Sequence, residues 1–161
     1  MKTRLCEELG MTFPLFAFTR SPEVVVEVSK AGGMGVLAAI GRSTSELEEL
    51  LQWIDANIDG KPYGVDVVIP AGHVKSNAGE GMGNATDLQK MLPKQHLEFV
   101  NTLLAHHNVP PLPDDVTIHE AMHGWTDAVS RAQVDAALKH PIALLANALG
   151  PPPADIIDRC H

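Results

Sequence analysis

The sequence has little of what several classes of protein require. It contains two cysteines, Cys6 and Cys160, near its opposite ends. Two isolated thiols are typical of a reducing compartment, although the ends of a chain can meet, so a disulfide stays an alternative. The first residues carry charge but no apolar segment of the signal-peptide kind, and no apolar run approaches the roughly 20 residues that span a bilayer. These absences predict a cytoplasmic protein with no membrane segment.

Basic residues are also scarce and scattered. Twelve Lys and Arg against twenty Asp and Glu give a net charge of −8 at pH 7. Nucleic acids and anionic membranes are bound by clustered Lys and Arg, so neither is an expected partner. A Walker A loop is absent, and the glycine-rich segments 32–35 and 79–84 are predicted to be turns. Neither follows a strand pattern and opens a helix, as a dinucleotide-binding loop does.

What the sequence does contain is an alternation of strand and helix patterns. Short apolar runs rich in β-formers are typical of strands that are covered on both faces. Helical patterns separate them, which is the order expected of parallel strands joined by crossover helices. The predicted fold class is therefore α/β, with about four parallel strands at 14–18, 35–39, 63–69 and 142–147.

Two of the predicted helices begin with capping residues. Ser21 and Pro22 have the character of an N-cap followed by an N1 proline. Ser43 and Glu46 form a capping box at the start of the second helix. Apolar residues then recur at helical spacing. Those expected to face the core are Val24, Val25 and Val28 in the first helix and Leu47, Leu50, Leu51 and Ile54 in the second.

The alternation is interrupted after the third strand. Seven of the eight histidines lie between residues 73 and 140, and helical patterns at 93–107 and 126–139 replace the βα order. Leu97, Val100 and Leu104 should share one face of the first of these helices. We predict one domain with a helical insertion, in which 1–71 and 140–161 form the strand-containing part and 72–139 forms the insertion.

Three segments resemble the nitronate monooxygenase (2-nitropropane dioxygenase-like) family. They are residues 14–39, with Phe-Ala-Phe at 16–18, the strand Gly-Val-Asp at 64–66, and the run 140–158. The resemblance implies a (β/α)₈ barrel. At 161 residues the chain is well short of the roughly 250 that a complete barrel takes, so we expect its amino-terminal half.

The resemblance also implies a function. Members of this family are FMN-dependent oxidoreductases that oxidise alkyl nitronates or related small acids with oxygen. Four positions carry over as cofactor-binding residues: Ala17, Phe18, Asp66 and Asn147. Asp66 stands where the family often has Asn, and Asn147 has a structural turn as its alternative role. The family's catalytic histidine and its late phosphate-binding loop have no counterpart in this sequence, so no catalytic residue is expected here and the chain alone should be inactive.

A second hypothesis rests on the motif H-E-x-x-H at His119, Glu120 and His123. On a helix, two histidines four residues apart can bind one zinc ion while the glutamate acts on a zinc-bound water, as in zinc hydrolases. His140 or Asp155 could be the third ligand. The alternative is structural, because Thr117 and Glu120 also fit a capping box and Gly124 follows at once.

A third hypothesis is a non-catalytic fragment or interaction domain. Four parallel strands that do not close into a barrel leave two unpaired edges, and such edges invite further pairing. The chain should then associate with itself, rely on the helical insertion to shield an edge, or require a missing carboxy-terminal half.

Overall fold

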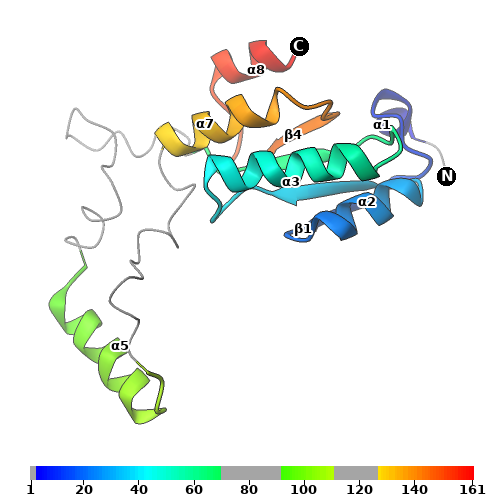
Figure 1. Ribbon diagram of the computed structural model, residues 1–161. Coiled ribbons are helices and arrows are strands. Elements are labelled where there is room, and N and C mark those ends of the chain that lie inside the picture. Colours follow the sequence, from blue (N-terminus) through cyan, green and yellow to red (C-terminus); the bar gives the residue numbers. More distant parts are fainter. Residues whose placement is uncertain (1–2, 70–91, 111–126) are drawn as a thin grey trace.

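The computed structural model describes residues 3–69, 92–110 and 127–161 (Figure 1). Strands and helices alternate in the order that the sequence predicts. The described elements are α1 (Arg4–Glu8), β1 (Phe16–Thr19), α2 (Pro22–Lys30), β2 (Met34–Ala38), α3 (Thr44–Asn57), β3 (Gly64–Val67), α5 (Lys94–His106), α7 (Asp127–Ala137), β4 (Leu144–Asn147) and α8 (Ala154–Cys160).

The four strands form one parallel sheet in the order β1-β2-β3-β4. The predicted α/β class with four parallel strands is confirmed. The fourth strand is shorter than predicted because Ile142 still belongs to the preceding turn, where its N–H donates to the carbonyl of His140 at 2.8 Å.

The two faces of the sheet contact different elements. Leu37, Val65 and Val67 belong to the main hydrophobic core, together with buried residues of α2, α3, α7 and α8. Met34 and Val36 belong to a smaller cluster with Cys6 of α1 and with Met11. Since side chains alternate along a strand, residues 34, 36 and 38 of β2 lie on the face that α1 contacts. This second cluster gathers at the amino-terminal ends of the strands.

Helix α7 packs as part of the main core. Val134, Ala136 and Ala137 are buried there, and α7 contacts both α3 and β3. Helix α7 is therefore a part of the crossover from β3 to β4 that packs against the sheet. The predicted division of the domain at residue 139 stays a prediction.

Both predicted helix starts are confirmed. The Ser21 hydroxyl accepts the N–H of Val24 at 3.3 Å, with Pro22 at the first helical position. Ser43 and Glu46 form the capping box. One predicted core residue is wrong: Val24 is 43% exposed. Val26 is buried instead, because α2 lies on β2 with the face that carries residues 25, 26 and 29.

Helix α5 differs from the other long helices in having no buried residue. The predicted helix at 93–107 is confirmed at Lys94–His106, and Leu97, Val100 and Leu104 are all exposed. Figure 1 shows α5 apart from the sheet. Its apolar face is not part of either described core cluster.

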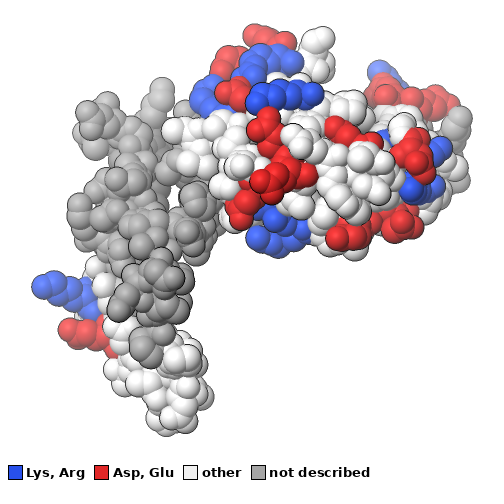
Figure 2. Space-filling view, in the orientation of Figure 1, with Lys and Arg blue, Asp and Glu red and all other residues white. Residues whose placement is uncertain are grey.

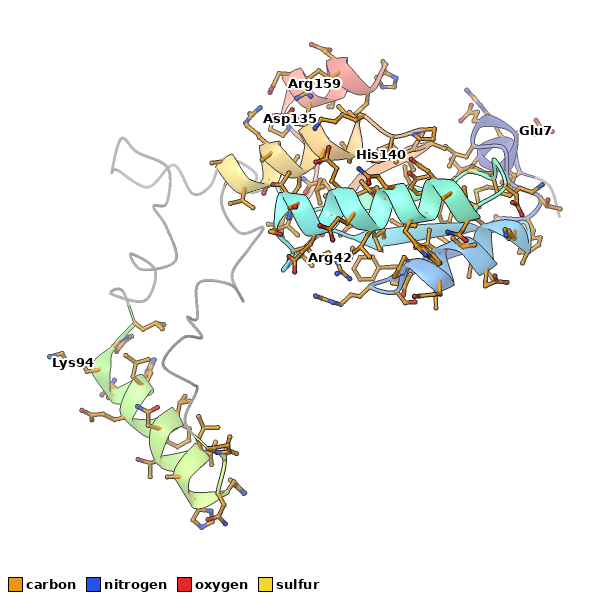
Figure 3. All side chains as sticks on the ribbon, viewed as in Figure 1. Glu7, Arg42, Lys94, Asp135, His140 and Arg159 are labelled. Atoms are coloured by element: carbon orange, nitrogen blue, oxygen red, sulfur yellow. The ribbon has the colours of Figure 1, made fainter. Side chains whose placement is uncertain are left out.

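A partly buried polar cluster joins three elements at the amino-terminal edge of the sheet. The hydroxyl of Tyr63 donates to one carboxylate oxygen of Asp55 at 2.6 Å. Nδ1 of His140, labelled in Figure 3, lies 2.6 Å from the other oxygen. Burial, and then the Asp55 carboxylate, raise the pKa of Tyr63. The cluster connects the end of α3, the start of β3 and the turn before β4.

Gly35 allows α2 to approach the sheet closely. A Cβ atom added there would lie 2.4 Å from Cα and 2.5 Å from the carbonyl oxygen of Val25. Both are backbone atoms, so no side-chain rotation can relieve the overlap. The Gly35 N–H also donates to the hydroxyl of Ser29 at 3.0 Å, which fixes the helix against the strand.

We expect Gly35→Ala to lower the free energy of unfolding by about 3 kcal/mol, because α2 must move off β2. Urea denaturation followed by circular dichroism measures the change. Gly60→Ala is the matched control, since nothing lies within 4 Å of its added Cβ and only its positive φ of 69° opposes it. The control should cost about 1 kcal/mol. Equal losses at the two positions would contradict the close contact.

Strand β1 is an edge of the described sheet, and apolar side chains are exposed along it. Leu15, Phe16 and Phe18 are 48%, 42% and 64% exposed. A parallel edge with free backbone groups and apolar side chains is a template for pairing with another strand. The other edge, β4, is also unpaired on its outer side among the described strands.

The isolated chain should therefore associate in a concentration-dependent way, with a light-scattering mass above 17.3 kDa. A charge on the edge should oppose this, so Phe18→Lys is expected to shift the protein toward monomer. Trp53→Lys places the same charge at an exposed apolar residue of α3, away from the edge, and should leave the mass unchanged. A monomeric wild-type protein at all concentrations would contradict the prediction.

Candidate functional site

The predicted cofactor-binding residues lie toward one edge of the sheet. Because the strands are parallel, their carboxyl ends meet at the same edge, and ligands of α/β barrels bind there. Ala17 and Phe18 lie in the second half of β1, Asp66 is the third residue of β3, and Asn147 is the last of β4. The sheet thus brings the four positions to one rim, which is a geometric condition for a shared site.

Asp66 is the most unusual of the four. It is only 7% exposed, and the described residues offer its carboxyl group no hydrogen bond or ion pair. Burial raises the pKa of this carboxyl above its usual value, and no neighbouring charge contributes to the shift. Burial of an unpaired carboxylate costs free energy, so its presence in a strand points to a role other than stability.

The register places small residues on both sides of Asp66. It pairs with Ala38 of β2 and Ala146 of β4. Paired residues of a parallel sheet share a face, and this is the face of Val36, opposite the main core. The carboxyl therefore belongs to the face that would line the inside of a barrel.

Asn147 has a structural role. Its amide oxygen accepts the N–H of Ile69 at 2.8 Å, and its amide nitrogen donates to the carbonyls of Ile69 at 3.3 Å and Gly150 at 2.9 Å. These bonds join the chain after β3 to the turn after β4. They agree with the structural role in a turn that is the alternative predicted for Asn147 from the sequence. Contact of this side chain with a flavin stays a prediction.

Ala17 and Phe18 lie on opposite faces of β1. Phe18 pairs with Val36 and so shares the face of Asp66, where its ring is largely exposed. Ala17 pairs with Gly35 on the face that α2 covers. Only the main chain of Ala17 is therefore available to a ligand on the Asp66 face.

Two polar residues of α7, which the sequence patterns did not single out, hold the loops of this rim. The hydroxyl of Ser130 donates to the carbonyl of Val68. The side-chain nitrogen of Gln133 donates to the carbonyls of Ala39 at 3.0 Å and Arg42 at 2.9 Å. Both side chains are buried. The sequence signal that could have identified them is a polar residue at a helix position that faces the core.

Two arginines after β1 and β2 are a further feature that sequence reasoning missed. Arg42 donates to the carbonyls of Arg20 at 2.6 Å and Ala38 at 3.3 Å, and Arg20 donates to that of Ile40 at 3.3 Å. Burial, and then the charge of Arg20, lower the pKa of Arg42. The pair bridges the two loops through backbone carbonyls.

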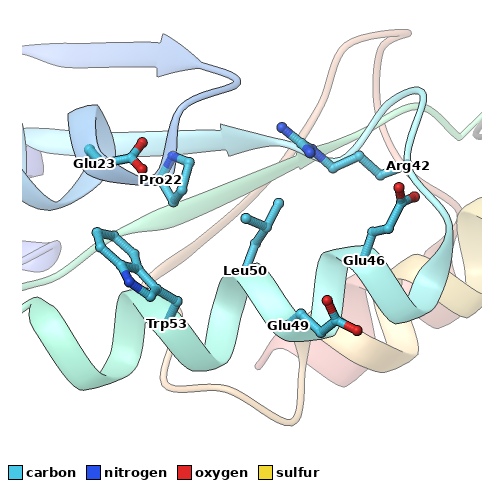
Figure 4. A pocket seen from close by; sticks show the side chains of 7 residues that line it. All are labelled: Pro22, Glu23, Arg42, Glu46, Glu49, Leu50 and Trp53. Carbon is cyan, nitrogen blue, oxygen red and sulfur yellow. The ribbon is translucent and has the colours of Figure 1, made fainter.

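Arg42 also faces a groove between the first turn of α2 and the first three turns of α3. Figure 4 shows its guanidinium group on one side, with the carboxyl group of Glu46 near it and Trp53 farther along α3. The groove lies in the helical layer outside the sheet, on the opposite side from Asp66. It mixes acidic, basic and apolar side chains, and it shares no lining residue with the predicted flavin positions.

The zinc motif at 119–123 lies outside the described residues, as do the glycines at 79–84. The two suggested third ligands have other partners. His140 contacts Asp55, and Asp155 is 2.5 Å from Arg131, whose hydrogen bond lowers the pKa of that carboxyl. A second pair, Arg159 and Asp135, crosses the same interface, and both charge signs mix on the α7–α8 surface in Figure 2.

Other negative findings concern the same part of the chain. Within residues 3–69, 92–110 and 127–161, no group of three or more His, Cys, Asp or Glu could hold a metal ion. Neither cysteine forms a disulfide, Cys6 being buried and Cys160 exposed. The described helices are too short or too polar to cross a bilayer.

The chain is similar to part of a monooxygenase. It is 38% identical over 167 aligned residues to a Mycobacterium tuberculosis protein described as "Putative monooxygenase Rv1533". The alignment covers 100% of this chain and only 43% of that protein, so the chain spans less than half the length of this relative. No family model matches the sequence.

A solved structure agrees with the fold. The nitroalkane oxidase of Streptomyces ansochromogenes superposes with a TM-score of 0.63 at 16% identity, over 98% of this chain and 39% of that enzyme. At this identity the likeness concerns the fold, which is that of part of a (β/α)₈ barrel. The resemblance to the nitronate monooxygenase family predicted from the sequence is confirmed by these two comparisons.

The carboxyl group of Asp66 makes the stability of the folded protein depend on pH. Its raised pKa means that the unfolded chain releases this proton at a lower pH than the folded protein does. The contribution to stability is thus complete below about pH 3.9, the usual carboxyl value, and is lost as the pH rises through the raised pKa. We expect Asp66→Asn to stabilise the protein at pH 8 by roughly 1 kcal/mol and to have little effect at pH 4.

Thermal unfolding at both pH values measures the difference. Asp158→Asn, the same substitution at an exposed residue of α8, is the control and should change stability little at either pH. A destabilised Asp66→Asn protein at pH 8 would show that the carboxylate has a favourable partner.

Proposed function

We propose that this chain forms one wall of the flavin site of an FMN-dependent oxidoreductase of the nitronate monooxygenase type. The observation that carries the proposal is Asp66, a buried carboxyl without a partner among the described residues, at the edge where barrels bind their ligands. The similarity of the whole chain to a longer monooxygenase supports the class of reaction.

The residues on this face fit the edge of an aromatic ring. Asp66 offers one polar group, and Ala38 and Ala146 beside it are small enough to leave room. Phe18 adds an exposed apolar ring on the same face. Small-molecule sites are commonly built in this way, from apolar walls and a few polar groups that fix orientation.

Each predicted residue then has a defined task. Phe18 would exclude water from one side of the ring, and the main chain of Ala17 would border it. Asp66 would orient the ring by a hydrogen bond. Asn147 would act indirectly, because its bonds to Ile69 and Gly150 fix the neighbouring loops. When bound, FMN supplies the electron transfer from a nitronate to oxygen.

The remaining parts of the site would come from elsewhere in a complete barrel. The catalytic histidine and phosphate-binding loop that the family resemblance implies have no counterpart in this sequence. We propose an alkyl nitronate or a related small acid as substrate, with oxygen as co-substrate, and a cytoplasmic location. We also propose that residues 72–139 form a helical insertion of the same domain.

The purified 161-residue chain should be colourless and should not oxidise alkyl nitronates, since four strands provide a wall that binds the flavin ring weakly but no anchor for the FMN phosphate that would hold the cofactor through purification. Absorbance near 450 nm and oxygen consumption with an alkyl nitronate measure the two properties. A yellow protein with one FMN per chain and nitronate turnover would contradict the expected division of the site.

A further inference from the structure

Asp66 lies in surroundings that disfavour a negative charge. The residues paired with it are Ala38 and Ala146, and its neighbours two positions away along the chain are Gly64 in β3 and Val68 just after it. None of them carries a donor on its side chain. A carboxylate in this position is partly desolvated and has gained no compensating partner among the described residues.

No other charged group faces Asp66 from the described elements. On the same face, β2 contributes Met34 and Val36, and β4 contributes Leu144. One titratable side chain of α1 belongs to the cluster on this face: the thiol of Cys6, which lies at the amino-terminal end of the sheet. The helices α2, α3 and α7 pack on the opposite face. The state of the carboxyl therefore depends on burial and on whatever ligand covers it.

We propose that Asp66 is a specificity-determining residue that binds its ligand as an uncharged carboxylic acid, donating its O–H to an acceptor atom of the bound ring. The inference rests on the proposed flavin site. Where the free protein holds a carboxylate, binding takes up one proton from solvent, and no other bond forms or breaks. The ligand class is a flat ring with an exposed carbonyl oxygen or imine nitrogen.

The physical reason is that a ligand completes the desolvation. A ring placed over Asp66 removes its remaining water, which raises the free energy of the charged form further. The uncharged acid keeps a donor, as the amide of Asn does, whereas a carboxylate can only accept. Asp at this position thus retains the hydrogen bond of an amide but makes it dependent on pH.

Binding of lumiflavin, which has the flavin ring but no phosphate, tests the inference on the chain as it stands. Flavin fluorescence is titrated with protein between pH 5 and pH 9. Wild-type affinity should fall about threefold to tenfold as the pH rises. Asp66→Asn should bind at all pH values without this fall, and Asp66→Ala should bind about threefold to tenfold more weakly than wild type at pH 5.

Calorimetry in two buffers of different ionisation enthalpy should show proton uptake by the wild type at pH 8 and none by Asp66→Asn. Asp158→Asn is the matched control and should retain both the pH dependence and the proton uptake.

The outcomes separate this inference from the proposed function. Wild-type binding that is independent of pH, or Asp66→Ala binding as tightly as wild type, overturns the role of Asp66 but leaves a flavin site. Absence of lumiflavin binding by the wild type at every pH overturns the proposed flavin site and, with it, this inference.

Discussion

The hydrogen bonding of a parallel sheet is the constraint from which the other features follow. Each strand pairs with the next, and the crossover helices that this requires lie on the face of Leu37, Val65 and Val67. The opposite face has, among the described residues, a small cluster around Met34 and α1 at one end. At the other end, the same face carries the exposed ring of Phe18 and the buried carboxyl of Asp66. The helices thus cover one face of the sheet. The opposite face is the one that a ligand would contact and that would line the inside of a complete barrel.

The two ends of the strands have different chemistry. At the amino-terminal edge, Asp55 bonds both Tyr63 and His140, so every member of the cluster has a partner. At the carboxyl edge, the hydroxyl of Ser130 and the side-chain nitrogen of Gln133 hold the loops, while the side-chain oxygen of Gln133 and the carboxyl of Asp66 have no partner among the described residues. Satisfied polar groups fix a structure, and an unsatisfied one is a candidate for binding. This division agrees with the general arrangement of barrel enzymes.

Local signals made much of the fold predictable. The serines that cap α2 and α3, and the apolar runs of the strands, specify their elements through short-range bonds and burial. The buried face of α2 was less predictable, because the contact of Val25 with Gly35 selects Val26 over Val24. Asp66 stood out as a charge in an apolar strand. The roles of Ser130 and Gln133 depend on partners 62 to 94 residues away in the sequence, which no local pattern encodes.

The central claim is that Asp66 is a buried carboxyl facing a ligand site. A pH titration of its side-chain carboxyl carbon by NMR, assigned with Asp66→Asn, measures the state of that group directly. The account predicts a titration midpoint above the value of about 3.9 that is usual for aspartate. A midpoint at or below this value would contradict it, because the carboxyl would then be solvated or paired with a positive charge.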